Sequence, residues 1–148
     1  SNTFVGGESK VSSETATTIS AVDTITDVLG TFASADLQHF DSPANGQLRH
    51  IGISPIEYTV VFDFILEGEQ SKDYRIHLYK DDGTTDVSVY SMYRVINKFQ
   101  GGRDVATFNG QTSITLNQND LVYWRVENES NDKDCTLELD SAWSVKER

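Results

Sequence analysis

Hydrophobic and polar residues alternate along several segments of the chain with a period of two, which predicts β-strands. The clearest segment is 58–67, where one face is wholly apolar and the other is mixed. Further alternating faces occur over 74–79, 87–95 and 135–146. The apolar face of the first segment consists of Tyr58, Val60, Phe62, Phe64 and Leu66. Each such strand is expected to place one side against a core.

Turn sequences separate these segments. Their Pro, Gly, Asn and Asp residues predict turns at 41–46, 81–83, 101–102, 109–110 and 117–120. Residues 20–30 alone could be helical, and their Thr, Ile and Val content favours a strand. About eight to ten strands at this spacing predict an all-β antiparallel sandwich, because no helical alternation interrupts them.

The length of 148 residues fits one domain with a core of its own. Residues 1–14 are rich in Ser, Gly, Glu and Lys and are expected to form a flexible N-terminal arm or linker. Residues 15–148 are expected to form the sandwich, because no second linker or repeat follows.

Charge and composition narrow the range of partners. The net charge is −11, from 12 basic and 23 acidic residues, so nucleic acid and anionic lipid are poor partners. No apolar run approaches the ~18 residues that cross a bilayer, so no membrane insertion is expected. The single cysteine, Cys135, is in phase with Leu137 and is expected to be buried.

Catalytic motifs do not emerge from the sequence. No G-x-S-x-G elbow is present, and the three histidines stand near no such motif. Glu138 and Asp140 would lie ~7 Å apart on one strand face, a separation that suits glycoside hydrolysis. The polar face of an ordinary antiparallel sheet is the preferred interpretation of this pair. We therefore expect no enzyme, no catalytic residue and no cofactor.

Metal binding is weighed in the same way. His39 and His50 flank a turn, with Asp41 nearby, and could converge on a metal if the flanking segments pair. The acidic turns 81–83 and 132–134 could offer oxygen ligands to calcium, but neither fits the EF-hand loop. Nothing in the spacing requires either site, so no metal is assigned.

The late strands are partly apolar on both faces. Tyr90 and Met92 oppose the face of Val89 and Tyr93, and Trp124 opposes the face of Tyr123. Such strands need a second cover, which a neighbouring subunit could supply. The alternative is a thick monomeric core with loops folded over the outer sheet.

The last third of the chain resembles the C1q/TNF-like jelly roll. The resemblance rests on residues 114–128 (ITLNQNDLVYWRVEN), on 137–145 (LELDSAWSV) and on the hairpin 74–83 (YRIHLYKDDG). The chain departs from that family at Asn119, where the family usually has glycine. This resemblance implies a jelly-roll β-sandwich.

A second resemblance covers roughly residues 15–148. Residues 36–50 (DLQHFDSPANGQLRH) and 100–106 (QGGRDVA) are similar to C-terminal domains of bacteriophage virion structural and tail-fibre proteins. The resemblance implies a homotrimeric knob on a virion assembled in the host cytoplasm. Such domains bind a host-surface receptor or glycan, or contact other virion proteins. No catalytic residue carries over.

Together these features predict a non-enzymatic, trimeric receptor-binding knob. The trimer-axis candidates are Tyr90, Met92, Tyr123 and Trp124. The candidates for contact with a target lie on three loops, 41–46, 81–86 and 129–134, and are Asp41, Asn45, Asp82, Asp86, Asn131 and Asp132. The alternatives are a capsid decoration, cement or head-fibre protein, a carbohydrate-binding module and, least favoured, a small hydrolase that uses Glu138.

Overall fold

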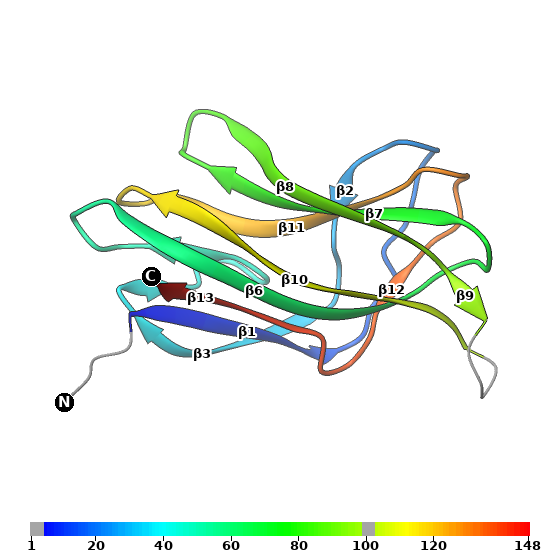
Figure 1. Ribbon diagram of the computed structural model, residues 1–148, viewed down its shortest axis with the longest axis horizontal. Coiled ribbons are helices and arrows are strands. Elements are labelled where there is room, and N and C mark those ends of the chain that lie inside the picture. Colours follow the sequence, from blue (N-terminus) through cyan, green and yellow to red (C-terminus); the bar gives the residue numbers. More distant parts are fainter. Residues whose placement is uncertain (1–4, 99–102) are drawn as a thin grey trace.

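A computed structural model describes residues 5–98 and 103–148, so the turn expected at Gly101-Gly102 lies outside the described residues. Two antiparallel sheets pack face to face (Figure 1). The first sheet has the order β3 (Thr31–Gln38), β1 (Gly6–Ser13), β13 (Ala142–Glu147), β6 (Ile56–Glu67), β10 (Asp104–Leu116) and β9 (Asn97–Lys98), and β12 (Thr136–Leu137) also pairs with β6. The second has the order β4 (Phe40–Asp41), β5 (Leu48–His50), β11 (Leu121–Asn128), β7 (Asp73–Asp81) and β8 (Asp86–Val95), and β2 (Thr26–Asp27) also pairs with β11.

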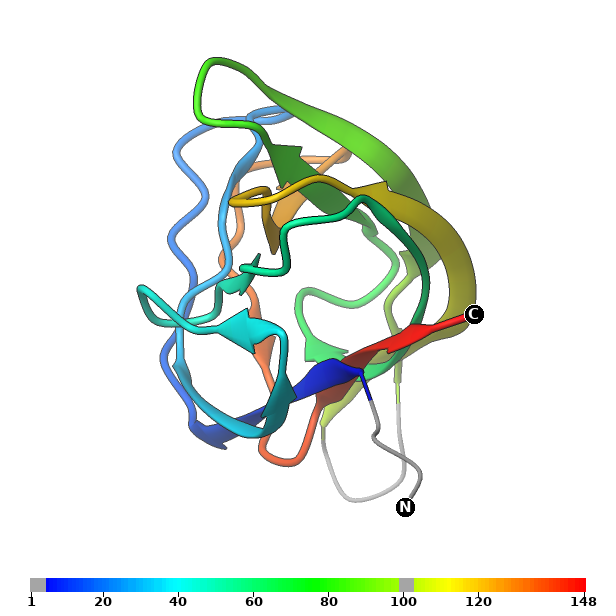
Figure 2. The same ribbon diagram turned by 90° about the vertical axis from the view of Figure 1, so that its left-hand side faces the viewer.

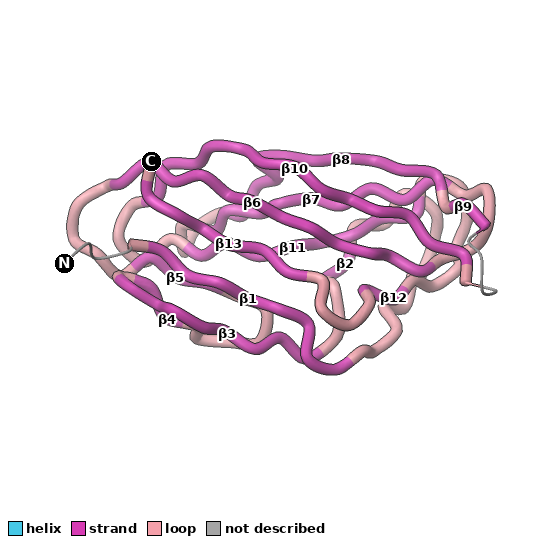
Figure 3. The backbone as a smooth tube through the Cα atoms, turned by 60° about the horizontal axis from the view of Figure 1, so that its bottom comes forward, coloured by secondary structure: helices cyan, strands magenta, loops and turns pink. Residues whose placement is uncertain are grey.

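The chain passes repeatedly from one sheet to the other, so strands that are consecutive in sequence often belong to different sheets. β6 lies between β13 and β10, and β11 lies between β5 and β7. Figure 2 shows the two layers enclosing a common interior, and Figure 3 shows the first sheet from its outer side. Nine of the thirteen strands in the described ranges are longer than two residues, which agrees with the expected number. Across those ranges, no helix is long and apolar enough to span a bilayer.

The core forms where the alternating faces of the two sheets meet. The inward side chains of β6 are between 0% and 2% exposed, as their pattern predicts. Trp124 of β11 packs its ring against Phe62 and Phe64, with centroids 5.1 and 5.0 Å apart. Trp143 of β13 completes the group, 6.0 Å from Trp124. The predicted β-sandwich and its main core strand are therefore confirmed.

The prediction of an N-terminal arm over 1–14 is wrong for residues 6–13. β1 pairs with β13 on one side and with β3 on the other. Glycines and serines make up five of its eight residues, so the alternating hydrophobic pattern that predicts a strand is weak here. Gly7 permits close packing, since a Cβ there would lie 2.8 Å from Leu37 Cδ2. Val11 is fully buried, so this segment contributes to the core.

The turn predicted at Asn109-Gly110 is also wrong. β10 runs through both residues, which pair with Asp63 and Phe62 of β6. A Cβ on Gly110 would lie 3.2 Å from Phe62 Cζ, so this glycine serves close packing. A glycine in a strand has the same sequence signature as one in a turn.

The strand expected over 135–146 is interrupted. β12 and β13 are separate, and Asp140 between them has a left-handed φ of 70°. Leu139, expected in the core, is 51% exposed. Cys135 is buried as predicted, at 2% exposure, and burial raises the pKa of its thiol to about 12.

Two further segments give mixed outcomes. Within 20–30 only Thr26–Asp27 is a strand, so most of the expected strand is a loop. The turn predicted at 117–120 is confirmed, and Asn119 lies at φ 74°. Asparagine is among the residues that tolerate this left-handed conformation, which accounts for Asn in place of the family's glycine.

Candidate functional site

The outer face of the second sheet carries a group of aromatic and charged side chains from β7, β8 and β11. Tyr79 and Tyr123 stack with centroids 6.0 Å apart and an interplanar angle of 13°. The Arg125 guanidinium lies 4.3 Å from the Tyr79 centroid and 5.1 Å from that of Tyr123. Cation–π contacts of this kind hold the guanidinium over the rings.

Two aspartates fix Arg125 from different elements. Its Nε donates to Asp27 Oδ1 at 2.8 Å, and its Nη1 lies 2.8 Å from Asp86 Oδ2. Tyr123 also donates its hydroxyl to Asp86. The Arg125 hydrogen bond lowers the pKa of Asp86. The arginine is therefore an ordered feature of this face.

A pocket of about 400 Å³ opens beside Arg125. Its walls include Asp27, Asp86, Tyr123 and Arg125 from the sheet side. Asn45, Gln47 and Phe32 line it from the neighbouring loop and from β3. This mixture of acids, amides, a guanidinium and aromatic rings offers hydrogen bonds to a hydroxylated or polar ligand.

The predicted loop residues fall into two groups. Loops 41–46 and 81–86 meet at this pocket through Asn45 and Asp86. Loop 129–134 lies at the other end of the sheet, because β11 runs from Leu121 beside Asp81 to Asn128 beside Tyr74. The six candidates therefore do not form one surface.

Several of these candidates already bind within the chain. Asp41 forms an ion pair with Arg49. Asn45 accepts from Phe32 N at 2.8 Å and donates to Gly30 O at 2.6 Å. Asp82 accepts from Thr84 N and Thr85 N, and these bonds lower the pKa of Asp82.

At the other end, Asn131 bonds to Asn128 and Glu69. Asp132 lines a separate shallow pocket beside Gly68, Glu69, Lys133 and Asp134. Asn131 therefore has a structural role in its own loop.

A serine, a histidine and a glutamate form a chain of contacts on the outer face. His77 Nε2 lies 2.6 Å from Glu127 Oε1, and His77 Nδ1 lies 2.9 Å from Ser88 Oγ. His77 and Glu127 are 7% and 8% exposed. The contacts link β8, β7 and β11 side by side and so tie the edge strand to its sheet. The sequence did not reveal this group because its members are far apart in the chain.

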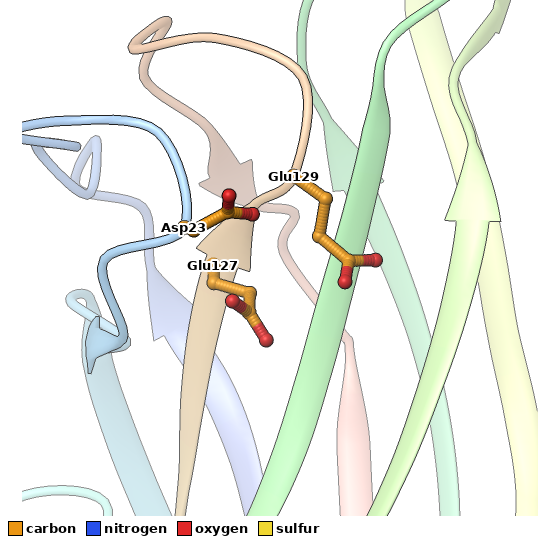
Figure 4. Close-up of side chains that lie close together, drawn as sticks. All are labelled: Asp23, Glu127 and Glu129. Carbon is orange, nitrogen blue, oxygen red and sulfur yellow. The ribbon is translucent and has the colours of Figure 1, made fainter.

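Three carboxylates lie close together at the C-terminal end of β11 (Figure 4). The ligand atoms of Asp23, Glu127 and Glu129 are within 4.8 Å of one another, the one such group among residues 5–98 and 103–148. Two of them already have partners, since Glu127 contacts His77 and Glu129 lies 3.2 Å from Arg75 Nε. The carboxylates therefore help to organise the sheet end.

The trimer-axis candidates occupy three environments. Trp124 is 4% exposed inside the core, so its prediction as a contact residue is wrong. Tyr123 is 8% exposed beneath Arg125. Tyr90 and Met92 are half-buried against the core at the edge of the sandwich. Pattern alone could not distinguish these cases, because both faces of β8 and of β11 are partly apolar.

Four of the eleven large hydrophobic residues that are exposed in the described ranges lie on β8. Val87, Val89, Tyr93 and Val95 are 51%, 41%, 53% and 41% exposed. β8 is the last strand of its sheet, so one of its edges has no partner there. A register shift opposite Leu78 and Tyr79 divides the strand and changes its side-chain phase.

A second surface lies on the outer face of the first sheet. It is a shallow depression of about 430 Å³, lined mainly by apolar atoms. Small side chains form its floor, namely Ala33, Ala35, Ala142 and Ser144. Val61 adds a 42% exposed aliphatic group, and Lys10 and Asp63 add charges.

The predicted carboxylate pair does not assemble. Glu138 is 6% exposed and forms an ion pair with Arg103. Asp140 has an exposed side chain and lies 3.8 Å from Lys10 Nζ. The turn between β12 and β13 separates the two environments, so the glycosidase arrangement is wrong.

Comparison with known proteins identifies the fold. Eiger TNF from S. frugiperda is similar over 99% of this chain and 94% of its own, with a TM-score of 0.69 and 10% identity. Murine APRIL at pH 5.0 is similar over 98% of this chain and 99% of its own, with a TM-score of 0.68 and 8% identity. No protein-family model matches the sequence, and no curated protein matches it. The chain therefore has the predicted TNF-like jelly-roll fold.

Proposed function

We propose that the protein is a non-enzymatic binding domain that assembles as a homotrimer. The observation that carries this proposal is the apolar edge strand β8, with its four exposed aliphatic and aromatic side chains. Exposed apolar side chains on the last strand of a sheet offer a surface that a partner chain can cover.

The two apolar surfaces favour a ring. The β8 edge belongs to the second sheet, and the shallow depression around Ala33 and Ala142 belongs to the first. When one copy places its edge on the depression of the next, the contact is head-to-tail, and such contacts close into rings when the rotation allows. The number three comes from the jelly-roll and virion resemblances.

The ligand site in this proposal is the Arg125 pocket. A trimer would display three copies of it, and simultaneous binding could raise avidity by ~10²–10⁴. The specific role we propose is a tail-fibre or receptor-binding knob of a bacteriophage virion, assembled in the host cytoplasm and recognising a host-surface molecule. Residues 36–50 and 100–106 support this role through their similarity to phage structural proteins. A capsid decoration or head-fibre role shares the same assembly and differs in the partner.

Carbohydrate binding is the second candidate function, and the composition of the pocket favours it. Tyr123 and Arg125 stand beside Asp27, Asp86 and Asn45, which can bond to sugar hydroxyls. This function is compatible with a trimer or with a monomer.

Solution mass tests the assembly. Light scattering at micromolar concentration is expected to give three times 16.5 kDa for the wild type. Val89→Arg should lower this mass, because it places a charge on the apolar edge. Ile53→Arg, at a residue 84% exposed and outside both surfaces, is the matched control and should keep the wild-type mass. A monomer at every concentration would contradict the trimer.

Binding assays then show whether the partner is a host cell, a glycan or a capsid. We expect the trimer to bind host cells or glycans on an array, and Asp27→Asn or Asp86→Asn to weaken this binding without changing the mass. Binding to purified empty capsids in place of host cells would favour the decoration role.

A further inference from the structure

The pocket beside Arg125 carries more negative than positive charge. Asp27, Asp81 and Asp86 line it, and Arg125 is the one basic residue among its described lining residues. The formal charge of the lining is therefore −2. The Arg125 hydrogen bond lowers the pKa of Asp86, so this carboxylate is ionised at neutral pH. A concave site lined by one sign of charge concentrates ions of the opposite sign.

The Arg125 guanidinium is already occupied within the chain. Its Nε donates to Asp27, its Nη1 lies 2.8 Å from Asp86 Oδ2, and its Nη2 lies 3.5 Å from the Tyr123 hydroxyl. Its flat face covers the Tyr79 ring, 4.3 Å from the centroid. All three nitrogens therefore have partners. A carboxylate or phosphate on a ligand would meet the aspartates without a free cation to bind.

Two of the carboxylates repel each other directly. Asp81 and Asp86 are partners in the register of β7 and β8, and like charges directly opposite on two strands are destabilising. Asp81 Oδ1 accepts from Gly83 N at 2.8 Å, but no described Lys, Arg or His forms an ion pair with Asp81. The adjacent Lys80 lies beside Asp120 instead. A bound cation would offset this uncompensated charge.

The rest of the lining suits a hydroxylated ligand. Asn45 and Gln47 contribute amide groups, and the pocket exposes more polar than apolar atoms. Sugar hydroxyls need such polar partners, whereas the methylene stem of a lysine side chain prefers an apolar slot. The volume of about 400 Å³ lies within the range of small-ligand sites. These features favour a cationic sugar over a basic side chain of a protein.

Building on the proposed function, which makes this pocket the ligand site, we propose that its ligand carries a primary ammonium group on a sugar ring, as in an oligosaccharide of glucosamine. The ammonium group would bind at the Asp81–Asp86 pair, and the hydroxyls would bond to Asn45 and Gln47. Acidic glycans would be excluded by the same carboxylates. One chain supplies every lining residue, so the site is complete in a monomer and in a trimer.

Calorimetry with two matched oligosaccharides tests the ligand class. A tetramer of glucosamine and its fully N-acetylated counterpart share one backbone and differ in the charge on nitrogen. We expect the full chain to bind the glucosamine tetramer at least about tenfold more tightly, because acetylation removes the positive charge. Raising the salt concentration from about 0.05 M to about 0.5 M should reduce this preference, because salt screens exposed charges.

Two isosteric variants locate the binding. Asp81→Asn removes one charge and keeps the oxygen that accepts from Gly83 N. It should weaken binding of the glucosamine tetramer by about two- to fivefold and leave the affinity for the N-acetylated tetramer unchanged. Asp140→Asn removes the same charge from a side chain that is 75% exposed and outside the pocket. It should leave both affinities unchanged, which separates the pocket from a general attraction of cations to an acidic chain.

Several results would overturn the inference. Absence of binding, or equal losses in Asp81→Asn and Asp140→Asn, would remove the pocket as an amino-sugar site. Equal or tighter binding of the N-acetylated tetramer, weakened by Asp27→Asn, would leave the proposed carbohydrate site and overturn only the charge assignment. Binding of a lysine-rich peptide in place of the sugar would assign a protein partner. A monomeric mass would contradict the proposed trimer and leave the amino-sugar site standing.

Discussion

The strands β6 and β8 show similar alternation in sequence and reach opposite outcomes in the structure. The inward residues of β6 are at most 2% exposed. Most residues of β8 are exposed, and its inward side chains, Tyr90 and Met92, are only half-buried. β6 has neighbours on both edges, whereas β8 ends its sheet.

The difference shows what alternation can predict. A period of two identifies the face of a strand that is apolar, but burial depends on what covers that face. The second sheet covers β6. The four exposed apolar residues of β8 remain 41–53% exposed within the described ranges, even though Arg75 lies over the ring of Tyr93, which is why we assign them to a contact between copies.

The largest expected effect on stability concerns β6, the strand that the second sheet covers. Phe62→Ala should lower the free energy of unfolding by about 3–5 kcal/mol, because it removes a buried ring that packs against Trp124. Denaturant unfolding measures the change. Val61→Ala, next in sequence and 42% exposed, is the control and should change the unfolding free energy of the dissociated monomer by about 0.5 kcal/mol or less. Equal effects would show that the two faces of β6 are not distinct.

Removing the His77 contacts that tie β8 to its sheet should have an intermediate effect on stability. His77→Ala leaves the buried Glu127 carboxylate and the Ser88 hydroxyl without their shared partner. We expect a loss of about 1–3 kcal/mol in the free energy of unfolding. Lys10→Ala, which removes the exposed contact with Asp140, should cost less than about 1 kcal/mol. If both variants behave alike, the network does not hold β8 in place.

Titration to alkaline pH should distinguish the buried Tyr58 and Cys135 side chains, which ionise at higher pH, from exposed side chains of the same types. Burial raises the pKa of Tyr58 on β6 from 10.0 to about 12, and that of Cys135 from 9.0 to about 12. The folded state therefore retains protons that the unfolded state loses. Their contribution to stability is complete below pH 9 and declines as the pH rises toward 12.

Spectrophotometric titration and thiol labelling check this prediction. Tyrosine absorbance should reveal a class that ionises near pH 12. Cys135 should react slowly with a thiol reagent at pH 8 in the folded protein and quickly in denaturant. Rapid labelling under native conditions would contradict the burial of this cysteine.

The smallest expected effect concerns the uncovered strand. Val89→Ala should change the unfolding free energy of the dissociated monomer by about 0.5 kcal/mol or less, because the side chain is 41% exposed. The same variant should weaken self-association measured by light scattering. A large loss of monomer stability with unchanged mass would assign Val89 to the core of the single chain.

The residue pattern by itself determined the all-β class, the apolar face of β6 and the burial of Cys135. Each depends on local periodicity, which the chain carries from residue to residue. The resemblance of 114–128 added the jelly-roll fold. Small residues hid β1, and one left-handed Asp140 divided the final strand, because neither feature changes the hydrophobic pattern.

The tertiary structure alone decided which residues meet. Ser88, His77 and Glu127 lie on three strands, and the His50 ring reaches the Asn117 carbonyl from 67 residues away in sequence. Trp124 and Tyr123 are neighbours in sequence, yet one enters the core and the other lies beneath Arg125. Sheet order and register set these contacts, and both arise from pairing between distant segments, which local periodicity does not encode.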